Sequence, residues 1–386
     1  MNDIYLIVGL LGGLAVISGY IFYKAKNLIP YVHSGAKTSA WKANLLTDAR
    51  LDELSESPQI KQILNILEDT QYQFYISQVS REGGVDVGEV EDQLNSFLNS
   101  RYEEILEIVP EERKGVIEKT IQITNLRNLA GITIGASEEI PEENIKEIVS
   151  PSPTMSQEEL EMLLSAKNLE RLLEYLEGSE YYDPLSEALE ERYEDEGISS
   201  LLRALDKTYY ETLWEDIERK KAQRSVLKEI VGTKIDMMNI KLIFRLKREE
   251  TPPERIAELL VVPYRLSEDQ LKDMTSAEDI QSAAEVIMDT FYGPPLQESL
   301  NRFEETGSLF EFENTLDEEF LRICRRISIS QPFSLAPVLT YIYLTETEVR
   351  NLRTIIGLKA EEIDAEKIKN NLIRRRKIEI QSAGRG

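Results

Sequence analysis

Three short stretches of the chain carry the same pair of polar residues, an acid or amide followed three positions later by an asparagine. The stretches are TNLRNLAGI, KIDMMNIKLI and ETEVRNLRTII, and their asparagines are separated by 111 and 112 positions. Because residues three apart share one face of a helix, each stretch presents two hydrogen-bonding side chains at one place. The pairs, with the basic residues that recur beside them, are Asn125, Arg127 and Asn128; Asp236, Asn239 and Lys241; and Glu348, Arg350, Asn351 and Arg353.

Amide and carboxylate groups in this pattern suit two roles. The first is a buried hydrogen-bonded cluster that locks two helices of each repeat together, since buried polar groups need partners. The second is a surface that binds another protein. We favour the structural role and keep the binding role open.

The residue types needed for enzyme chemistry are missing or badly spaced. His33 is the only histidine, so the sequence predicts neither a histidine-rich metal site nor a serine triad. An alanine separates Gly35 from Lys37 and Thr38, and no glycine stands at the upstream distance of a phosphate loop. We therefore predict a protein that is not an enzyme, with no catalytic residue, no cofactor, no metal and no small-molecule substrate.

The charge of the chain narrows its possible partners. Asp and Glu number 70 against 45 Lys and Arg, which gives a net charge of −25. A surface this negative repels phosphate backbones, so nucleic acid is excluded as a partner. The same charge suits a basic protein partner.

A longer repeat surrounds the polar pairs and identifies the elements that must position them. Three blocks, Leu45–Tyr72, Thr154–Tyr181 and Tyr264–Tyr292, align at offsets of 109 and 111 without an insertion. Each has Ser or Thr at a helix start, apolar residues at helical spacing, and a Thr or Ser two positions before a final Tyr. The pattern predicts the same pair of amphipathic helices three times.

The predicted fold is all-helical, with three tandem similar domains around a pseudo-threefold axis. Proline-containing acidic linkers separate the repeats. The predicted boundaries are residues 27–145, 146–257 and 258–373, followed by a basic tail at residues 374–386.

The start of the chain has a different character. Residues 4–23 carry no charge, and about 20 residues at ~1.5 Å each span the ~30 Å hydrocarbon core of a bilayer. Lysines follow this run, which places the soluble part in the cytoplasm. We therefore predict a transmembrane helix within residues 1–26 that contacts lipid, with Gly9 and Gly13 as its helix-packing face.

The repeats also carry a resemblance to a known family. The stretches NLIPYVHSGAKTSAWKANLLTDARLDEL, GTKIDMMNIKLIFRLK and YLTETEVRNLRTIIGLKAEEI, with the LEDTxY helix end, resemble the C subunit of the archaeal A-type ATP synthase. That protein is similar to the d subunit of the vacuolar proton pump. The similarity runs from about Tyr31 to Leu372, and residues 348–359 are its most specific part.

The resemblance implies a funnel of three similar helical domains. It also implies a non-catalytic rotor subunit on the cytoplasmic side of the cell membrane. Such a protein sits on the proteolipid ring, receives the foot of the central stalk and transmits torque during ATP synthesis driven by ion transport. The apolar N-terminal segment departs from the family, whose members begin near the equivalent of Tyr31. A membrane-tethered helical scaffold for another partner is the alternative.

Overall fold

The chain folds into helices throughout the part that can be described. The computed structural model describes residues 28–375, except residues 147 and 220–223. Within these residues the only extended pairing is an isolated bridge between Ser152 and Met155. The prediction of an all-helical protein is therefore confirmed for the described residues.

Three pairs of long helices form the inner part of the molecule. The first members are α5 (Val87–Ile108), α13 (Ile198–Arg219) and α19 (Phe310–Ser330). The second members are α14 (Arg224–Arg248), α20 (Ala336–Ala360) and, in the first pair, α6 (Glu111–Ile121) with α7 (Ile123–Ser137). Gln122 separates α6 from α7, so the long helix of the first repeat is the one that is broken.

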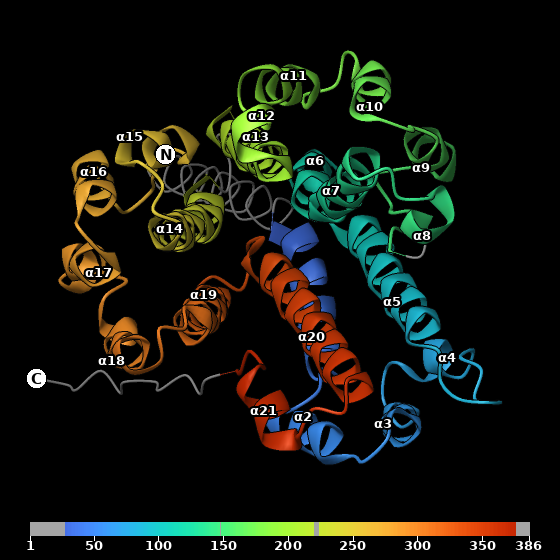
Figure 1. The fold of residues 1–386 in the computed structure, drawn as a ribbon. Helices are drawn as coiled ribbons and strands as arrows, with labels where there is room; N and C mark the ends of the chain where they lie inside the picture. The colour runs from blue at the N-terminus through green and yellow to red at the C-terminus, as the bar shows by residue number, and fades with distance from the viewer. Residues whose placement is uncertain (1–27, 147, 220–223, 376–386) are drawn as a thin grey trace, which may run out of the picture.

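These long helices pack in a closed ring. Within each pair the two helices contact each other, and the second helix also packs against the first helix of the next pair, as α7 does on α13 and α14 on α19. The ring closes because α20, near the end of the chain, packs along α5, near its beginning. Figure 1 shows α20 and α5 side by side and the long helices gathered around the centre of the molecule.

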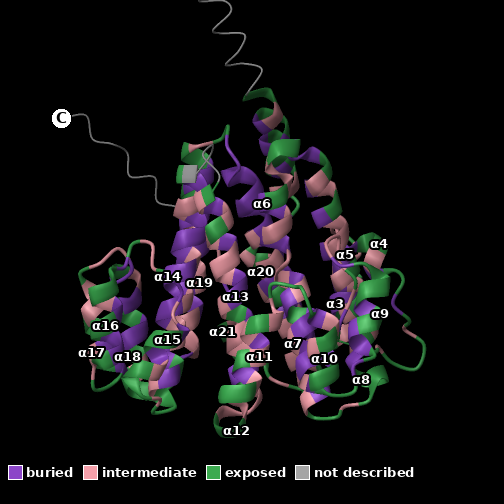
Figure 2. Cartoon of the chain, turned by 90° about the horizontal axis from the view of Figure 1, so that it is seen from above, coloured by how far each residue is buried: buried purple, intermediate pink, exposed green. Residues whose placement is uncertain are grey.

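Shorter helices surround this ring in three groups. In Figure 2 they cluster around one end of the long helices, which extend beyond them at the other end. A helix at residues 28–42 precedes the first group. The groups are α2 (Asp48–Glu56), α3 (Ile60–Leu67), α4 (Gln73–Ile76) and α21 (Ala365–Asn370); α8 (Glu142–Lys146), α9 (Gln157–Leu164), α10 (Leu169–Leu176), α11 (Tyr182–Glu191) and α12 (Tyr193–Glu196); and α15 (Pro253–Leu259), α16 (Glu268–Ser276), α17 (Ile280–Met288), η1 (Pro294–Leu296) and α18 (Gln297–Thr306).

The predicted helix starts of the three blocks are present. The side chains of Thr47, Ser156 and Ser267 each accept a hydrogen bond from the backbone N–H three residues later, at 3.2, 3.2 and 3.1 Å. The side chain of Gln270 in turn accepts a hydrogen bond from the backbone N–H of Ser267, at 2.9 Å, which completes a capping box. Each such cap supplies an acceptor for one of the N–H groups that a helix start leaves without a partner.

The predicted apolar stripes of the blocks form part of the core. Ile63, Leu64 and Leu67 of α3 are fully buried, and Ala283, Ala284 and Ile287 occupy the corresponding places in α17. The stripe of α10 is buried at Leu169, Leu172 and Leu176. Burial of one such leucine or isoleucine side chain contributes about 1.5–3 kcal/mol.

The predicted fold class is wrong in its membrane-spanning part. Among residues 28–375, leaving out 147 and 220–223, no helix has both the length and the apolar composition needed to cross a bilayer. The predicted helix at residues 1–26, with its packing face at Gly9 and Gly13, lies outside the described residues. The fold class is accordingly corrected to all-helical, without a transmembrane helix in the described part.

Candidate functional site

The asparagine of each repeated motif binds a backbone segment that lies 22 residues further along the chain. Asn239, which is fully buried on α14, donates to the carbonyl of Val261 at 2.8 Å and accepts from its N–H at 3.1 Å. Asn128 makes the same two bonds with Ser150, at 2.6 and 3.2 Å. Asn351 makes them with Ile373, at 2.9 and 3.0 Å. One amide side chain thus satisfies a backbone donor and acceptor in each repeat.

Asp236, the acid at the first position of the second motif, accepts hydrogen bonds from the block that follows. Asp236 on α14 accepts backbone N–H groups from Tyr264 and Arg265 at 2.7 Å each, and from Leu266 at 3.3 Å. It also accepts the hydroxyl of Tyr292 at 2.6 Å. Burial raises the pKa of this carboxyl, and the hydrogen bonds it accepts oppose that rise.

The acid of the third motif does the same with the block at the beginning of the chain. Glu348 on α20 accepts the N–H of Leu46 at 2.5 Å and the hydroxyl of Tyr72 at 2.9 Å. These two partners occupy the same places in their block as Leu266 and Tyr292 do in theirs. Burial raises the pKa of Glu348, and the guanidinium of Arg375, at 2.7 Å, opposes the rise.

Glu348 therefore joins residues that are far apart in the sequence. Leu46 lies 302 positions before it, and Gln71, which donates to its other oxygen at 2.9 Å, lies 277 positions before it. The third motif thus holds the first block, which has no motif before it in the chain. This carboxylate is the polar joint at which the ring closes.

Asn125, in the first motif, has a different set of partners. Its amide donates to the carbonyl and hydroxyl oxygens of Thr154, at 3.1 and 3.0 Å, and its oxygen accepts from the hydroxyl of Ser152. An amide carries both donors and an acceptor, so this joint needs no charge.

A local turn places the tyrosines that reach the acids. The hydroxyl of Thr70 donates to the carbonyl of Leu67 at 2.6 Å and accepts from the N–H of Tyr72 at 3.2 Å. Thr290 makes the same turn before Tyr292. The Thr-x-Tyr pattern at the end of these two blocks is therefore a turn that directs a buried phenol to the acid of a motif, Glu348 for Tyr72 and Asp236 for Tyr292.

The contacts of the first two motifs thus cross the predicted boundaries between repeats, and Glu348 of the third motif reaches the first block. In the first two motifs the asparagine holds the backbone that leads into the following block, and Asn125 and Asp236 contact that block itself. In the third motif Asn351 holds the backbone at Ile373, and Glu348 contacts the first block. The packing units are therefore offset from the repeats of the sequence. The boundaries at residues 145, 257 and 373 stay a prediction.

Replacing Asn128 by alanine tests the strength of one joint. We expect Asn128→Ala to lower the free energy of unfolding by about 1–2 kcal/mol, because the partly exposed backbone of Ser150 loses two hydrogen bonds. Chemical denaturation measures the change. Asn144→Ala, at an exposed position of α8, is the control and should leave the stability unchanged; equal losses for both variants would contradict the role of Asn128.

The basic residues of the motifs lie elsewhere, in two cavities between the long helices. Arg127, Arg350 and Arg353 line a cavity of about 380 Å³ formed by α7, α14, α19 and α20. Lys241 lines a neighbouring cavity of about 200 Å³ formed mainly by α13 and α14. The two cavities share Lys234 and Asp317, and we call them together the central cavity. Figure 1 shows the helices that line it around the centre of the ring.

Asp317 on α19 is the main acid of the central cavity. Lys241 binds it at 2.6 Å, Arg350 at 3.0 Å and Lys234 at 3.9 Å. Burial acts to raise the pKa of Asp317, but the three cations outweigh it and hold the pKa at about 2. Burial lowers the pKa of Lys241 to about 8 in spite of this carboxylate.

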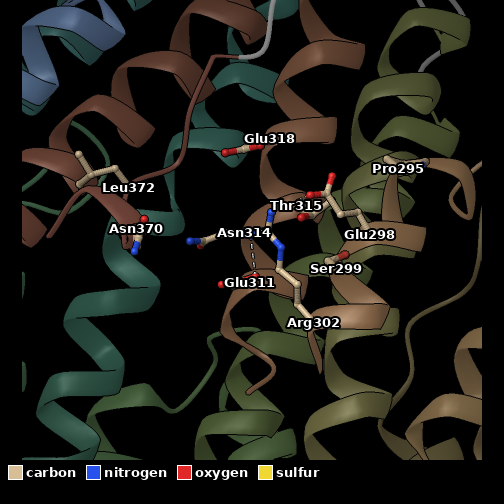
Figure 3. A pocket seen from close by; sticks show the side chains of 10 residues that line it. All are labelled: Pro295, Glu298, Ser299, Arg302, Glu311, Asn314, Thr315, Glu318, Asn370 and Leu372. Carbon is tan, nitrogen blue, oxygen red and sulfur yellow. Dashed lines mark hydrogen bonds and ion pairs between the residues drawn. The ribbon is translucent and has the colours of Figure 1, made fainter. Parts of the chain in front are cut away.

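Another cavity lies at the seam between the third group of short helices and the end of the chain. Figure 3 shows residues of α18 and α19 facing Asn370 and Leu372, around a space of about 130 Å³. Arg302 binds Glu298 at 2.7 Å and Glu311 at 3.0 Å, and Glu318 accepts the N–H of Arg374 at 3.0 Å. These charged groups form hydrogen bonds and ion pairs within the protein, so we interpret the cavity as a structural seam.

Sequence reasoning missed the acid that organises the central cavity. Asp317 stands 111 positions after Asp206, which in turn stands 111 after Asn95. All three polar side chains lie near basic residues of a neighbouring long helix: Asn95 accepts from Arg353, and Asp206 lines the cavity beside Arg245. A search of the long first helices at the repeat offset would have found this signal.

The first two residues of the predicted basic tail form ion pairs with other parts of the chain. Arg374 pairs with Asp52 at 2.6 Å and Arg375 pairs with Glu348, so the first two tail residues hold the N-terminal block. The remaining residues, 376–386, lie outside the described part.

No cluster of metal-binding side chains is found in the described part of the chain. Its distinguishing features are instead a helical ring, three polar joints and a charged central cavity. The model of the ATP synthase (C/AC39) subunit family matches residues 35–371. The chain belongs to this family.

Relatives in the family resemble the chain over nearly its whole length. The C subunit of the A-type ATP synthase of Methanocaldococcus jannaschii is 30% identical over 348 residues, which cover 90% of this chain and 87% of the relative. The C subunit of Pyrococcus horikoshii is 29% identical, and the match covers 92% of this chain and 95% of the relative. That of Thermococcus gammatolerans is also 29% identical, and the match covers 92% of this chain and 94% of the relative. The resemblance found in the sequence is therefore confirmed, and the family is that of a rotary ATPase component.

Proposed function

We propose that the chain is a non-catalytic rotor subunit of an A-type ATP synthase. In this role it connects the central stalk to the proteolipid ring in the membrane, from the cytoplasmic side, and transmits torque during ATP synthesis. The partners are then the central-stalk proteins and the proteolipid ring of the same complex. Family membership and the architecture of the helical ring support the proposal.

The closed ring of long helices is the observation that carries it. A protein that transmits torque must resist twisting, and a close-packed interior deforms little under strain. An open row of repeats would splay at its ends, whereas here α20 on α5 joins the last repeat to the first. The buried Glu348 joint and the paired Arg374 tie the chain ends at that closure.

The three polar joints add to this stiffness. Each places an asparagine against a backbone segment through two hydrogen bonds, in addition to apolar packing. Hydrogen bonds are directional, so they oppose sliding of one repeat past the next in a way that apolar contact alone does not.

Removal of the chain from its ATP synthase tests the proposal. We expect the membrane-bound complex to contain one copy of the chain. Complex prepared without it should hydrolyse ATP without driving ion uptake into vesicles, and addition of the purified chain should restore uptake. Retained ATP-driven ion uptake in a complex that lacks the chain would contradict the coupling role.

A further inference from the structure

One of the three equivalent second helices of the ring is interrupted within the described part of the chain. α14 and α20 run unbroken for 25 residues each, whereas Gln122 separates α6 from α7. The N–H of Gln122 still donates to Glu118, and the helical ladder resumes with the N–H of Leu126 on the carbonyl of Gln122. The N–H groups of residues 123–125, between these two bonds, lie outside the ladder, as at the start of a new helix.

A side chain of the next repeat occupies the place of a missing ladder bond. The hydroxyl of Tyr209, on α13, is buried and donates to the carbonyl of Thr120 at 2.8 Å. An unbroken helix would use this carbonyl for the N–H of Thr124, four residues later. A group inserted into the ladder is one of the known causes of a helix kink. The interruption is therefore built into the fold by a contact between two repeats.

No side-chain cap closes the break. Gln122 stands at the N-cap position of α7, and its side chain makes no capping hydrogen bond. The side-chain oxygen of Gln122 and the hydroxyl of Thr124 are both buried, and neither has a hydrogen-bond partner among the described residues. Thr233, which occupies the place of Gln122 in the unbroken α14, donates to the carbonyl of Glu229 at 2.6 Å. The break is therefore held by fewer hydrogen bonds than the same place in the second repeat.

The two halves of the interrupted helix are attached to different parts of the molecule. Figure 2 shows α6 in the part of the ring that extends beyond the short helices, and α7 in the part that these helices surround. α7 contacts α8, α9 and α10, and it holds the linker through Asn125 and Asn128. α6 packs on α5 and α13, and its Arg113 donates to the hydroxyl of Tyr31 at 3.0 Å. A bend at Gln122 therefore moves one end of the first repeat relative to the other.

We propose that the break at Gln122 is a hinge, about which α6 tilts relative to α7. An unbroken helix must lose ladder hydrogen bonds before it can bend sharply, and at Gln122 these bonds are already absent. The unbroken α14 and α20 keep the ring closed while the first repeat bends. In the proposed rotor subunit, the hinge is the place where twisting between the two ends of the ring is taken up. Only this last consequence rests on the proposed function.

Spin labels on both sides of the break test the proposal. The pair Lys114→Cys and Glu138→Cys spans α6 and α7. The control pair, Ser225→Cys and Glu249→Cys, marks the places 111 positions later, at the two ends of the unbroken α14. Cys324 is buried, so the labels attach to the introduced cysteines. Double electron–electron resonance on the purified full-length chain should give a distance distribution about twice as broad for the first pair as for the control pair.

Equal widths for the two pairs would overturn the hinge. Broad distributions for both pairs would overturn it as well, since they would indicate a ring that is loosely packed throughout.

Hydrogen exchange tests the break without labels. The amides of residues 123–125 should exchange about tenfold or more faster than those of residues 234–236, which lie at the equivalent place on α14. Equal protection of the two segments would contradict the interrupted ladder on which the hinge depends. Both measurements use the isolated chain, so failure of the hinge is distinguishable from failure of the coupling role.

Discussion

Replacing Glu348 by alanine opens the seam of the ring and lowers the free energy of unfolding by about 3 kcal/mol. The carboxylate accepts hydrogen bonds from Leu46, Gln71, Tyr72 and Arg375, and its side chain is 1% exposed. Its removal leaves a backbone N–H, a phenol and a guanidinium without their acceptor. Chemical denaturation measures the loss.

The position of the damage distinguishes a seam from an ordinary buried acid. Hydrogen exchange of Glu348→Ala should accelerate first in residues 45–72, because no covalent connection holds that block to α20. Asp236→Ala removes the equivalent acid where the chain is continuous, and should accelerate exchange around residues 261–266. Glu366→Ala, at an exposed ion pair on α21, should change neither measurement. Unchanged exchange in residues 45–72 of Glu348→Ala would contradict the seam.

Replacing Asp317 by asparagine should lower the free energy of unfolding by about 2–3 kcal/mol at pH 7. The variant keeps the shape of the side chain but leaves Lys234, Lys241 and Arg350 to repel one another. The folded pKa of about 2 lies below the ordinary value of roughly 3.9. The contribution is therefore complete above about pH 4 and is lost as the pH falls through 2.

Denaturation curves of the wild type and Asp317→Asn should accordingly converge between pH 4 and pH 2. Glu313→Gln is the control, since Glu313 pairs with an Arg245 side chain that is 55% exposed, and such a pair contributes less than about 1 kcal/mol. A loss in Asp317→Asn that stays constant with pH would show that the carboxylate charge is not its cause.

The local features of the fold could be predicted from the sequence because their causes are local. Ser267 and Gln270 form a capping box three residues apart, and the stripe at Ile63, Leu64 and Leu67 follows the helical period. The polar pairs were also found, since a repeat offset does not depend on knowing the fold. These signals give the helices and the number of repeats.

The partners of the polar pairs could not be predicted in the same way. An alignment of repeats shows that Glu348 and Asp236 are equivalent, but it contains no information on which block each of them meets. The partner of Glu348 lies 302 positions away, and its identity follows from closure of the ring. The role of Asp317 could not be predicted for a related reason. Its three cations come from two other helices that meet α19 only in the folded protein.

The seam at Glu348 also sets an order in which the parts of the chain can dock during synthesis on the ribosome. Leu46 and Tyr72 leave the ribosome well before their acceptor, and at roughly 5–20 residues per second the 302 residues between Leu46 and Glu348 take about 15–60 s to make. During that time α2 and α3 have no α20 on which to bury their apolar stripes. The first block to be synthesised is therefore the last to dock, and a nascent chain is open on this side until translation is almost complete.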